Sequence, residues 1–204
     1  MKKHLTIILV LTISLGLYAQ DKTNNFRIGI NLNLEKNLSS ENVAFDTYTG
    51  YWANYNKTNY KIGLNAEFGI RDKVTINSGI NYSNKDFTGT YYCAVCDFII
   101  PPSPENIEFR FIEIPVSLRY YFLPSKLKIF AEAGLTNLFS LNKENVDNTY
   151  ILGGKFGGGI EYNLNNGFAI QFTTEYMQGF TNIYKESNFK IRTLSFGIGL
   201  VKLL

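Results

Sequence analysis

Eight segments of this chain alternate apolar and polar residues, and the connections between them alternate in length. In the first segment, Phe26, Ile28 and Ile30 would face one side, while Arg27 and Gly29 would face the other. The eight segments span residues 26–34, 61–70, 73–82, 112–122, 127–135, 152–162, 168–176 and 194–200. Long connections at 35–59, 83–110, 137–149 and 178–188 are separated by short ones at 71–72, 123–126 and 163–167. A period of two predicts strands throughout, so we expect an all-β fold.

The two faces of these segments differ sharply in charge. The apolar face carries no charge, whereas the opposite face carries glycine, asparagine, threonine and nearly all the strand charges. A lipid-facing wall around a crowded polar interior explains both faces, and long loops opposite short turns are typical of outer-membrane barrels. We therefore predict an eight-stranded antiparallel up-and-down transmembrane β-barrel in the cell outer membrane. It would be a monomer in contact with outer-membrane lipids, with both termini periplasmic.

The first residues have the pattern of a secretory signal peptide. Lys2, Lys3 and His4 form a basic start, Leu5 to Leu17 are apolar, and a small residue, Ala19, precedes the expected cleavage point. The apolar stretch is shorter than the roughly 20 residues of a membrane-spanning helix. We expect residues 1–19 to be a signal peptide and residues 20–204 to form the barrel domain.

Charge and histidine content exclude several functions. The chain holds 20 basic and 17 acidic residues, and loss of a leader with two lysines leaves the rest close to neutral, which gives no electrostatic case for nucleic acid. The single histidine is His4, so residues 20–204 lack the usual general base and the usual metal ligand. We predict that the protein is not an enzyme, with no catalytic residues, no metal and no cofactor.

A set of charged residues on the polar face would point into the lumen. They are Glu67, Glu113, Arg119, Glu132, Lys155, Glu161 and Glu175. They could form a carboxylate-based catalytic site, but the interior of an eight-stranded barrel is only wide enough for side chains to fill it. Buried charges must then pair, so we expect an internal salt-bridge network.

The second long loop contains the only two cysteines, Cys93 and Cys96. A redox pair or half of a metal site is conceivable, but an oxidising envelope favours a small local disulfide. The apolar tip nearby could contact a partner or cover the barrel mouth. The candidate loop contact patch consists of Trp52, Phe98, Ile99 and Ile100.

One strand contains a proline, Pro115, which a barrel without edges tolerates best at a bulge. Phe109 and Phe111 are also out of phase with Ile112 and Ile114. We therefore expect a β-bulge near residues 110–115.

The stretch Ile112 to Phe122, which reads IEIPVSLRYYF, resembles the hallmark of the PorT-like outer-membrane β-barrel family. The glycine-rich segment from Gly153 to Gly159 and the glycine-alternating last strand are similar to that family as well. The resemblance covers essentially the whole chain after the leader. It implies a role in assembling or operating a secretion system for some members, and it supplies no catalytic residues.

Three functions remain open at this point. The first is a non-enzymatic outer-membrane barrel whose loops bind a partner or scaffold an envelope or secretion complex. The second is a small pore or a transporter of hydrophobic molecules, for which the glycine-rich sixth and eighth strands could leave a gap or could instead admit bulky neighbours. The third is a secreted, lipocalin-like lipid-binding barrel, which needs an apolar interior and a wet exterior.

Overall fold

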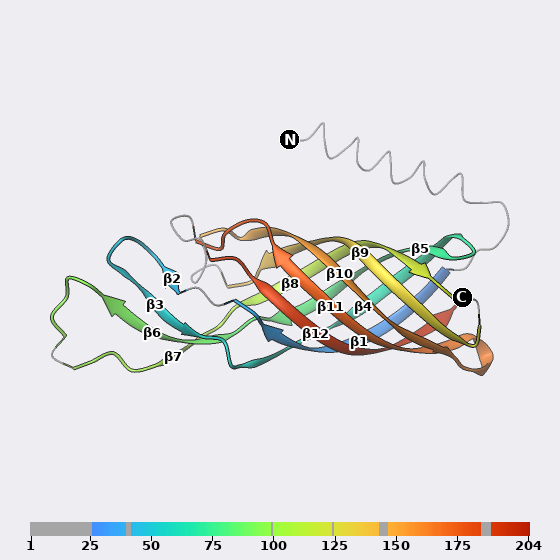
Figure 1. Cartoon of the computed structure of the whole chain (residues 1–204), viewed down its shortest axis with the longest axis horizontal. Coiled ribbons are helices and arrows are strands. Elements are labelled where there is room, and N and C mark those ends of the chain that lie inside the picture. The colour runs from blue at the N-terminus through green and yellow to red at the C-terminus, as the bar shows by residue number, and fades with distance from the viewer. Residues whose placement is uncertain (1–25, 40–41, 99, 124, 143–146, 185–188) are drawn as a thin grey trace, which may run out of the picture.

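The computed structural model describes residues 26–39, 42–98, 100–123, 125–142, 147–184 and 189–204. The predicted signal peptide and Ile99 lie outside these residues. Eight strands form a closed antiparallel barrel in the order β1-β12-β11-β10-β9-β8-β5-β4, closed by pairing of β1 with β4 (Figure 1). Their bounds are β1 Phe26–Asn37, β4 Thr58–Arg71, β5 Val74–Asn84, β8 Arg110–Tyr121, β9 Leu127–Ser140, β10 Tyr150–Asn163, β11 Phe168–Gly179 and β12 Arg192–Leu203. The predicted fold class is confirmed.

Strand alternation builds the apolar outer wall. Ile30, Leu32 and Leu34 of β1 are exposed, and they lie opposite Leu200 and other outward-facing residues of β12. Every barrel strand presents exposed large apolar residues in the same way, while polar residues between them point into the lumen. This distribution is the reverse of a lipocalin-like barrel, so that alternative is wrong.

The two ends of the barrel are unequal. The strands hold between 11 and 14 residues, more than the roughly 9–11 that cross a bilayer. At one end, here called the turn end, short connections join β4 to β5, β8 to β9 and β10 to β11 (Figure 1). In the last of these, Asn166 and Gly167 adopt positive φ angles of 64° and 77°, as an Asn-Gly turn requires.

The long connections at the other end, the loop end, build a sheet of their own. It has the order β2-β3-β6-β7, from β2 Val43–Ala44, β3 Thr49–Asn54, β6 Phe87–Cys93 and β7 Glu105–Ile107. This loop-end sheet projects beyond the barrel along its length (Figure 1). The period-two pattern of the barrel strands did not predict it.

The predicted bulge at residues 110–115 is wrong. The pairing of β8 with β9 runs in one unbroken register, in which Pro115 lies opposite Thr136. Phe109 and Phe111 are fully buried and share the inward phase of Glu113. Their phase differs from that of Ile112 because they line the interior. The irregular register lies elsewhere, between Gly69 and Arg71 at the turn end.

Among the described residues, no helix is long and apolar enough to span a membrane.

Candidate functional site

A buried carboxylate, Glu67 of β4, is the centre of the charge cluster nearest the turn end. It is fully buried and forms ion pairs with Arg27 and Arg119. Gln171 Nε2 donates a third hydrogen bond to Glu67 Oε1 over 3.0 Å. Two cations and an amide therefore share the charge of one carboxylate, which compensates its removal from water.

A second buried carboxylate, Glu161 of β10, extends this cluster. Arg27 Nη1 lies 2.7 Å from its Oε1, and Lys128 Nζ lies 3.3 Å from the same atom. Gln171 Nε2 and Tyr121 Oη donate to Glu161 Oε2 over 2.8 and 3.0 Å. Because Arg27 bridges Glu67 and Glu161, the two carboxylates belong to one network.

In the middle of the lumen the charges alternate in sign from one strand to another. Arg119 Nη2 lies 2.7 Å from Glu132, and Glu132 lies 2.7 Å from Lys155 Nζ. Lys155 Nζ also lies 2.8 Å from a Glu175 carboxylate oxygen, and the other Glu175 oxygen lies 2.7 Å from Lys61 Nζ. Each side chain in this series bridges two of opposite charge.

The network ends below the loop-end sheet, at Lys85. Its Nζ lies 2.6 Å from Glu35 and 2.8 Å from Glu113, and Lys85 is fully buried. Lys61 also reaches Glu35 and Glu113, at 3.4 and 3.8 Å. A continuous lumen ladder of ion pairs therefore runs from the turn end to the loop end.

The lumen ladder is electrically balanced in the described part of the chain. It contains six carboxylates and six cations: Glu35, Glu67, Glu113, Glu132, Glu161, Glu175, Arg27, Lys61, Lys85, Arg119, Lys128 and Lys155. All seven lumen charges predicted from the sequence lie in this ladder. Those seven alone are five carboxylates and two cations, which would leave three negative charges uncompensated.

The five other residues of the lumen ladder were harder to assign to the lumen from the sequence. Arg27, Lys61 and Lys128 alternate in phase with the other polar residues, and that phase could have identified them. Lys85 follows the last residue of β5, and Glu35 lies where the sequence suggested a loop. Only the three-dimensional pairing assigns these two to the lumen.

Space in the lumen is small. A cavity of about 80 Å³ lies among the middle charges, next to Asn77, Glu132 and Lys155. That volume suits a few waters, whereas ligand pockets usually measure about 300–1,000 Å³. The carboxylates in the middle of the ladder therefore have no room beside them for a ligand of that size. At the turn end, Arg27, Tyr121 and Lys128 line a wider cavity of about 790 Å³ at the barrel mouth.

Neighbouring side chains occupy the space beside Gly159 of β10 and Gly197 of β12, whereas Gly157, Gly158 and Gly199 line the small central cavity. A Cβ at Gly159 would lie 2.7 Å from the Phe130 ring, and one at Gly197 would collide with the Asn33 amide. Of the two sequence interpretations of these glycines, the structure favours the second. The glycines let large side chains fill the lumen.

At the loop end of the barrel, buried aromatic rings pack against one another. Phe87, Phe109 and Phe189 are fully buried, with centroid separations of 5.6 Å between Phe87 and Phe109 and 6.4 Å between Phe109 and Phe189. Tyr55 stacks on Phe189 with ring centroids 5.9 Å apart, and the Phe111 ring lies 6.3 Å from that of Phe109. We call these five residues the aromatic plug. It joins the loop-end sheet to the barrel, since inward residues of β9, β10 and β11 belong to the same apolar cluster.

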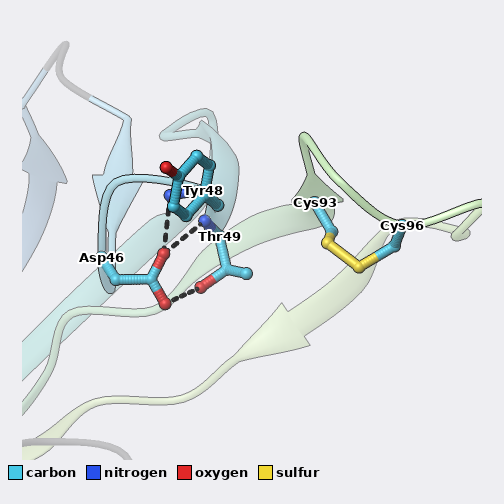
Figure 2. Close-up of a disulfide and its surroundings, with 5 residues drawn as sticks. All are labelled: Asp46, Tyr48, Thr49, Cys93 and Cys96. Carbon is cyan, nitrogen blue, oxygen red and sulfur yellow. Dashed lines mark hydrogen bonds between the residues drawn. A yellow bond between two sulfur atoms is a disulfide. The ribbon is translucent and has the colours of Figure 1, made fainter.

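The tip of the loop-end sheet carries the two cysteines. Cys93 and Cys96 form a disulfide at the end of β6 (Figure 2). In the hairpin beside it, the Asp46 carboxylate accepts hydrogen bonds from the Thr49 hydroxyl and from the backbone N–H groups of Tyr48 and Thr49, over 2.6–2.7 Å (Figure 2). The Thr49 hydroxyl bond, followed by the backbone bonds, lowers the pKa of Asp46. Within the described residues, no cluster of His, Cys, Asp and Glu could hold a metal ion.

The candidate contact patch is divided between two faces of the loop-end sheet. Trp52 is 58% exposed and stacks on Tyr92, with centroids 5.3 Å apart. Phe98 instead contacts Tyr91, the preceding residue of β6, at 6.2 Å. Successive residues of a strand point to opposite faces, so Trp52 and Phe98 do not share a surface. Ile100 is 80% exposed near the tip.

Comparisons with known proteins agree with this architecture. A family model described as "Outer membrane protein beta-barrel domain" matches residues 5–201. No curated protein matches the chain.

Three solved structures share the fold. The outer membrane protein OprG from Pseudomonas aeruginosa is 13% identical, with a TM-score of 0.57 over 90% of this chain and 97% of that one. Neisserial surface protein A is 14% identical, with a TM-score of 0.52 over 88% of this chain and 97% of that one. Escherichia coli outer membrane protein W is 10% identical, with a TM-score of 0.51 over 91% of this chain and all of that one. Likeness at this identity concerns the fold alone.

Proposed function

Because this chain belongs to the outer membrane protein β-barrel domain family, we propose that it is a non-conducting outer-membrane anchor for a rigid binding surface. The surface is the loop-end sheet, and its ligand is a partner protein of the envelope or the cell surface. The observation that carries this proposal is the aromatic plug. The same buried rings seal the loop-end mouth of the barrel and fix the loop-end sheet to the barrel. One cluster therefore both blocks conduction and holds the binding surface in place.

The packing of the lumen supports our proposal that the barrel does not transport molecules. Paired charges of the lumen ladder occupy the middle of the barrel, and the cavity of about 80 Å³ there is too small for the hydrophobic molecules of the alternative proposal to pass. Residues 20–204 contain no histidine, and the carboxylates of the ladder are all ion-paired. Both features favour binding over catalysis.

The exposed aromatic face supports partner binding. Trp52 and Tyr92 form a stacked pair on the solvent face of β3 and β6, with Thr90 opposite Trp52. Aromatic residues dominate the energy of protein interfaces because they bury a large area at low entropic cost. A rigid sheet limits the ordering cost of association further.

The topology and the leader complete the proposal. Residues 1–19 act as a signal peptide, and both termini face the periplasm, because the described ends lie at the turn end (Figure 1). The stretch IEIPVSLRYYF remains the basis for a PorT-like assignment, in which the partner belongs to a secretion system.

Photo-crosslinking in cells tests the binding proposal. A photoreactive phenylalanine analogue replaces Trp52 in one variant and Leu118, a lipid-facing residue 56% exposed, in a matched control. We expect a discrete protein adduct from position 52 and none from position 118. Equal adducts at both positions, or none at position 52, would contradict the assignment of this face.

A further inference from the structure

A shallow groove lies in the lipid-facing wall where β12, β1, β4 and β5 adjoin. Its volume is about 490 Å³. Small outward-facing residues account for the groove, since Ala66 is paired with Ile28 on one side and with another small residue, Ser78, on the other. Its outward-facing apolar lining includes Ile28, Ile30, Leu64, Ala66, Ile80 and Leu200.

One cationic side chain lies at the turn end of this groove. Lys202 lines it, lies opposite Ile28 across the β12–β1 pair, and lies opposite Phe168 across the β11–β12 pair. Its Nζ is 5.4 Å from the centroid of the Phe168 ring. Within the described residues, Lys202 makes no ion pair, in contrast to the fully paired cations of the lumen.

The position of Lys202 on the outer wall is unusual. The other charged residues in the regular outward phase of the described barrel strands are Lys36, Arg110 and Arg192, and all three lie at the loop end. At the turn end, Arg71 lies beside the irregular register of β4, opposite Val74, and lines the barrel mouth, not the groove. Lys202 is therefore the outward-facing charge that lines the groove. A lysine there can keep its ammonium at headgroup level while its stem lies along apolar surface.

We propose that the groove and Lys202 form a binding site for a phospholipid with an anionic headgroup. One acyl chain occupies the groove, whose lining consists almost wholly of hydrocarbon. The headgroup phosphate pairs with the Lys202 ammonium, which has no anionic partner in the described chain. In the orientation proposed above, the lipid belongs to the periplasmic leaflet.

The pairing of a groove with a cation distinguishes this site from general contact with lipid. Lys126 also lies over an aromatic ring at the turn end, 5.2 Å from the centroid of Tyr162. It lines the open mouth of the barrel, beside Arg71 and Lys73, and does not line the groove. Lys126→Gln is therefore a matched control for Lys202→Gln.

Native mass spectrometry of the purified protein in detergent tests the site, with phosphatidylglycerol and phosphatidylcholine of equal chain length as probes. Lys202→Gln should weaken phosphatidylglycerol binding about fivefold, the factor equivalent to about 1 kcal/mol per lysine near an anionic lipid. Lys126→Gln should leave it unchanged. Equal binding of the two lipids by the wild type, or equal effects of the two lysine variants, would overturn the proposal.

A second pair of variants tests the groove itself. Ala66→Leu fills it from the lipid side, whereas Ala133→Leu adds the same bulk to the outward face of β9. We expect Ala66→Leu to weaken phosphatidylglycerol binding and Ala133→Leu to preserve it. Heat-modifiable gel migration checks that each variant is folded. The assignment of the groove would be overturned if both variants lost phosphatidylglycerol binding, or if neither variant did.

Discussion

Glu67→Gln tests the lumen ladder at a carboxylate that is ion-paired with two arginines. Glu67 is fully buried and neutralises part of the charge on Arg27 and Arg119. The substitution keeps the shape of the side chain but leaves two guanidinium groups short of one negative charge. Removing one partner of a buried ion pair costs about 3–5 kcal/mol, because the remaining charge stays buried without compensation.

The assay is equilibrium unfolding by urea in detergent micelles, with the folded fraction read from heat-modifiable gel migration. Glu108→Gln is the control, because Glu108 forms a surface pair with Arg110 and should shift the midpoint little. The double variant Glu67→Gln, Arg27→Gln removes one charge of each sign and should be more stable than Glu67→Gln alone. A loss below about 1 kcal/mol for Glu67→Gln would refute the reasoning that this carboxylate is buried and essential to the charge balance.

Three further outcomes are expected. Phe109→Ala removes the central ring of the aromatic plug and should cost about 3–5 kcal/mol in the same unfolding assay; a loss near zero would mean that the plug does not close the barrel. Replacing Cys93 and Cys96 with serine should leave the unfolding midpoint unchanged and speed amide exchange only at the tip of the loop-end sheet; a large midpoint shift would contradict a local role. The lowered pKa of Asp46 means that its contribution to the hairpin is present above the unfolded pKa and is lost as the pH falls through the folded one. The protection factor of the Thr49 amide, which is its intrinsic exchange rate divided by the observed rate at the same pH, should therefore fall on acidification in the wild type and be low at every pH in Asp46→Ala.

The barrel could be predicted from the sequence because its signal is local and repeated. In a strand, residues two apart share a face, so Ile28 and Ile30 already indicate a wall before any pairing is known. The chain then needs only short turns at one end to bring neighbouring strands together. The same phase assigns all seven predicted charges to the polar face, and all seven take part in the ion pairs of the lumen ladder.

The loop-end sheet could not be predicted in this way. It pairs β3 with β6, two segments about 40 residues apart that are separated by a barrel hairpin, and its strands are as short as two residues. Alternation over such short segments carries little information. The error at Phe109 and Phe111 had a related cause, because apolar residues on the inward phase are misread as a change of face when the lumen is assumed to be polar throughout.

The pairing partners of Lys85 and Glu35 also depend on tertiary structure. Neither lies in the alternating part of a segment predicted from the sequence, and their contact joins the end of β1 to the connection after β5. A requirement for charge balance would have indicated that cations were missing from the predicted lumen set. It would not have identified which ones.

We infer that the lumen ladder and the aromatic plug together seal the barrel. Single-channel recording of the purified protein in planar bilayers at high salt tests it most directly. We predict no stable conductance steps from the wild type, with heat-modifiable migration of the same sample showing that the protein is folded. Regular, long-lived open steps from folded wild-type protein would contradict the claim.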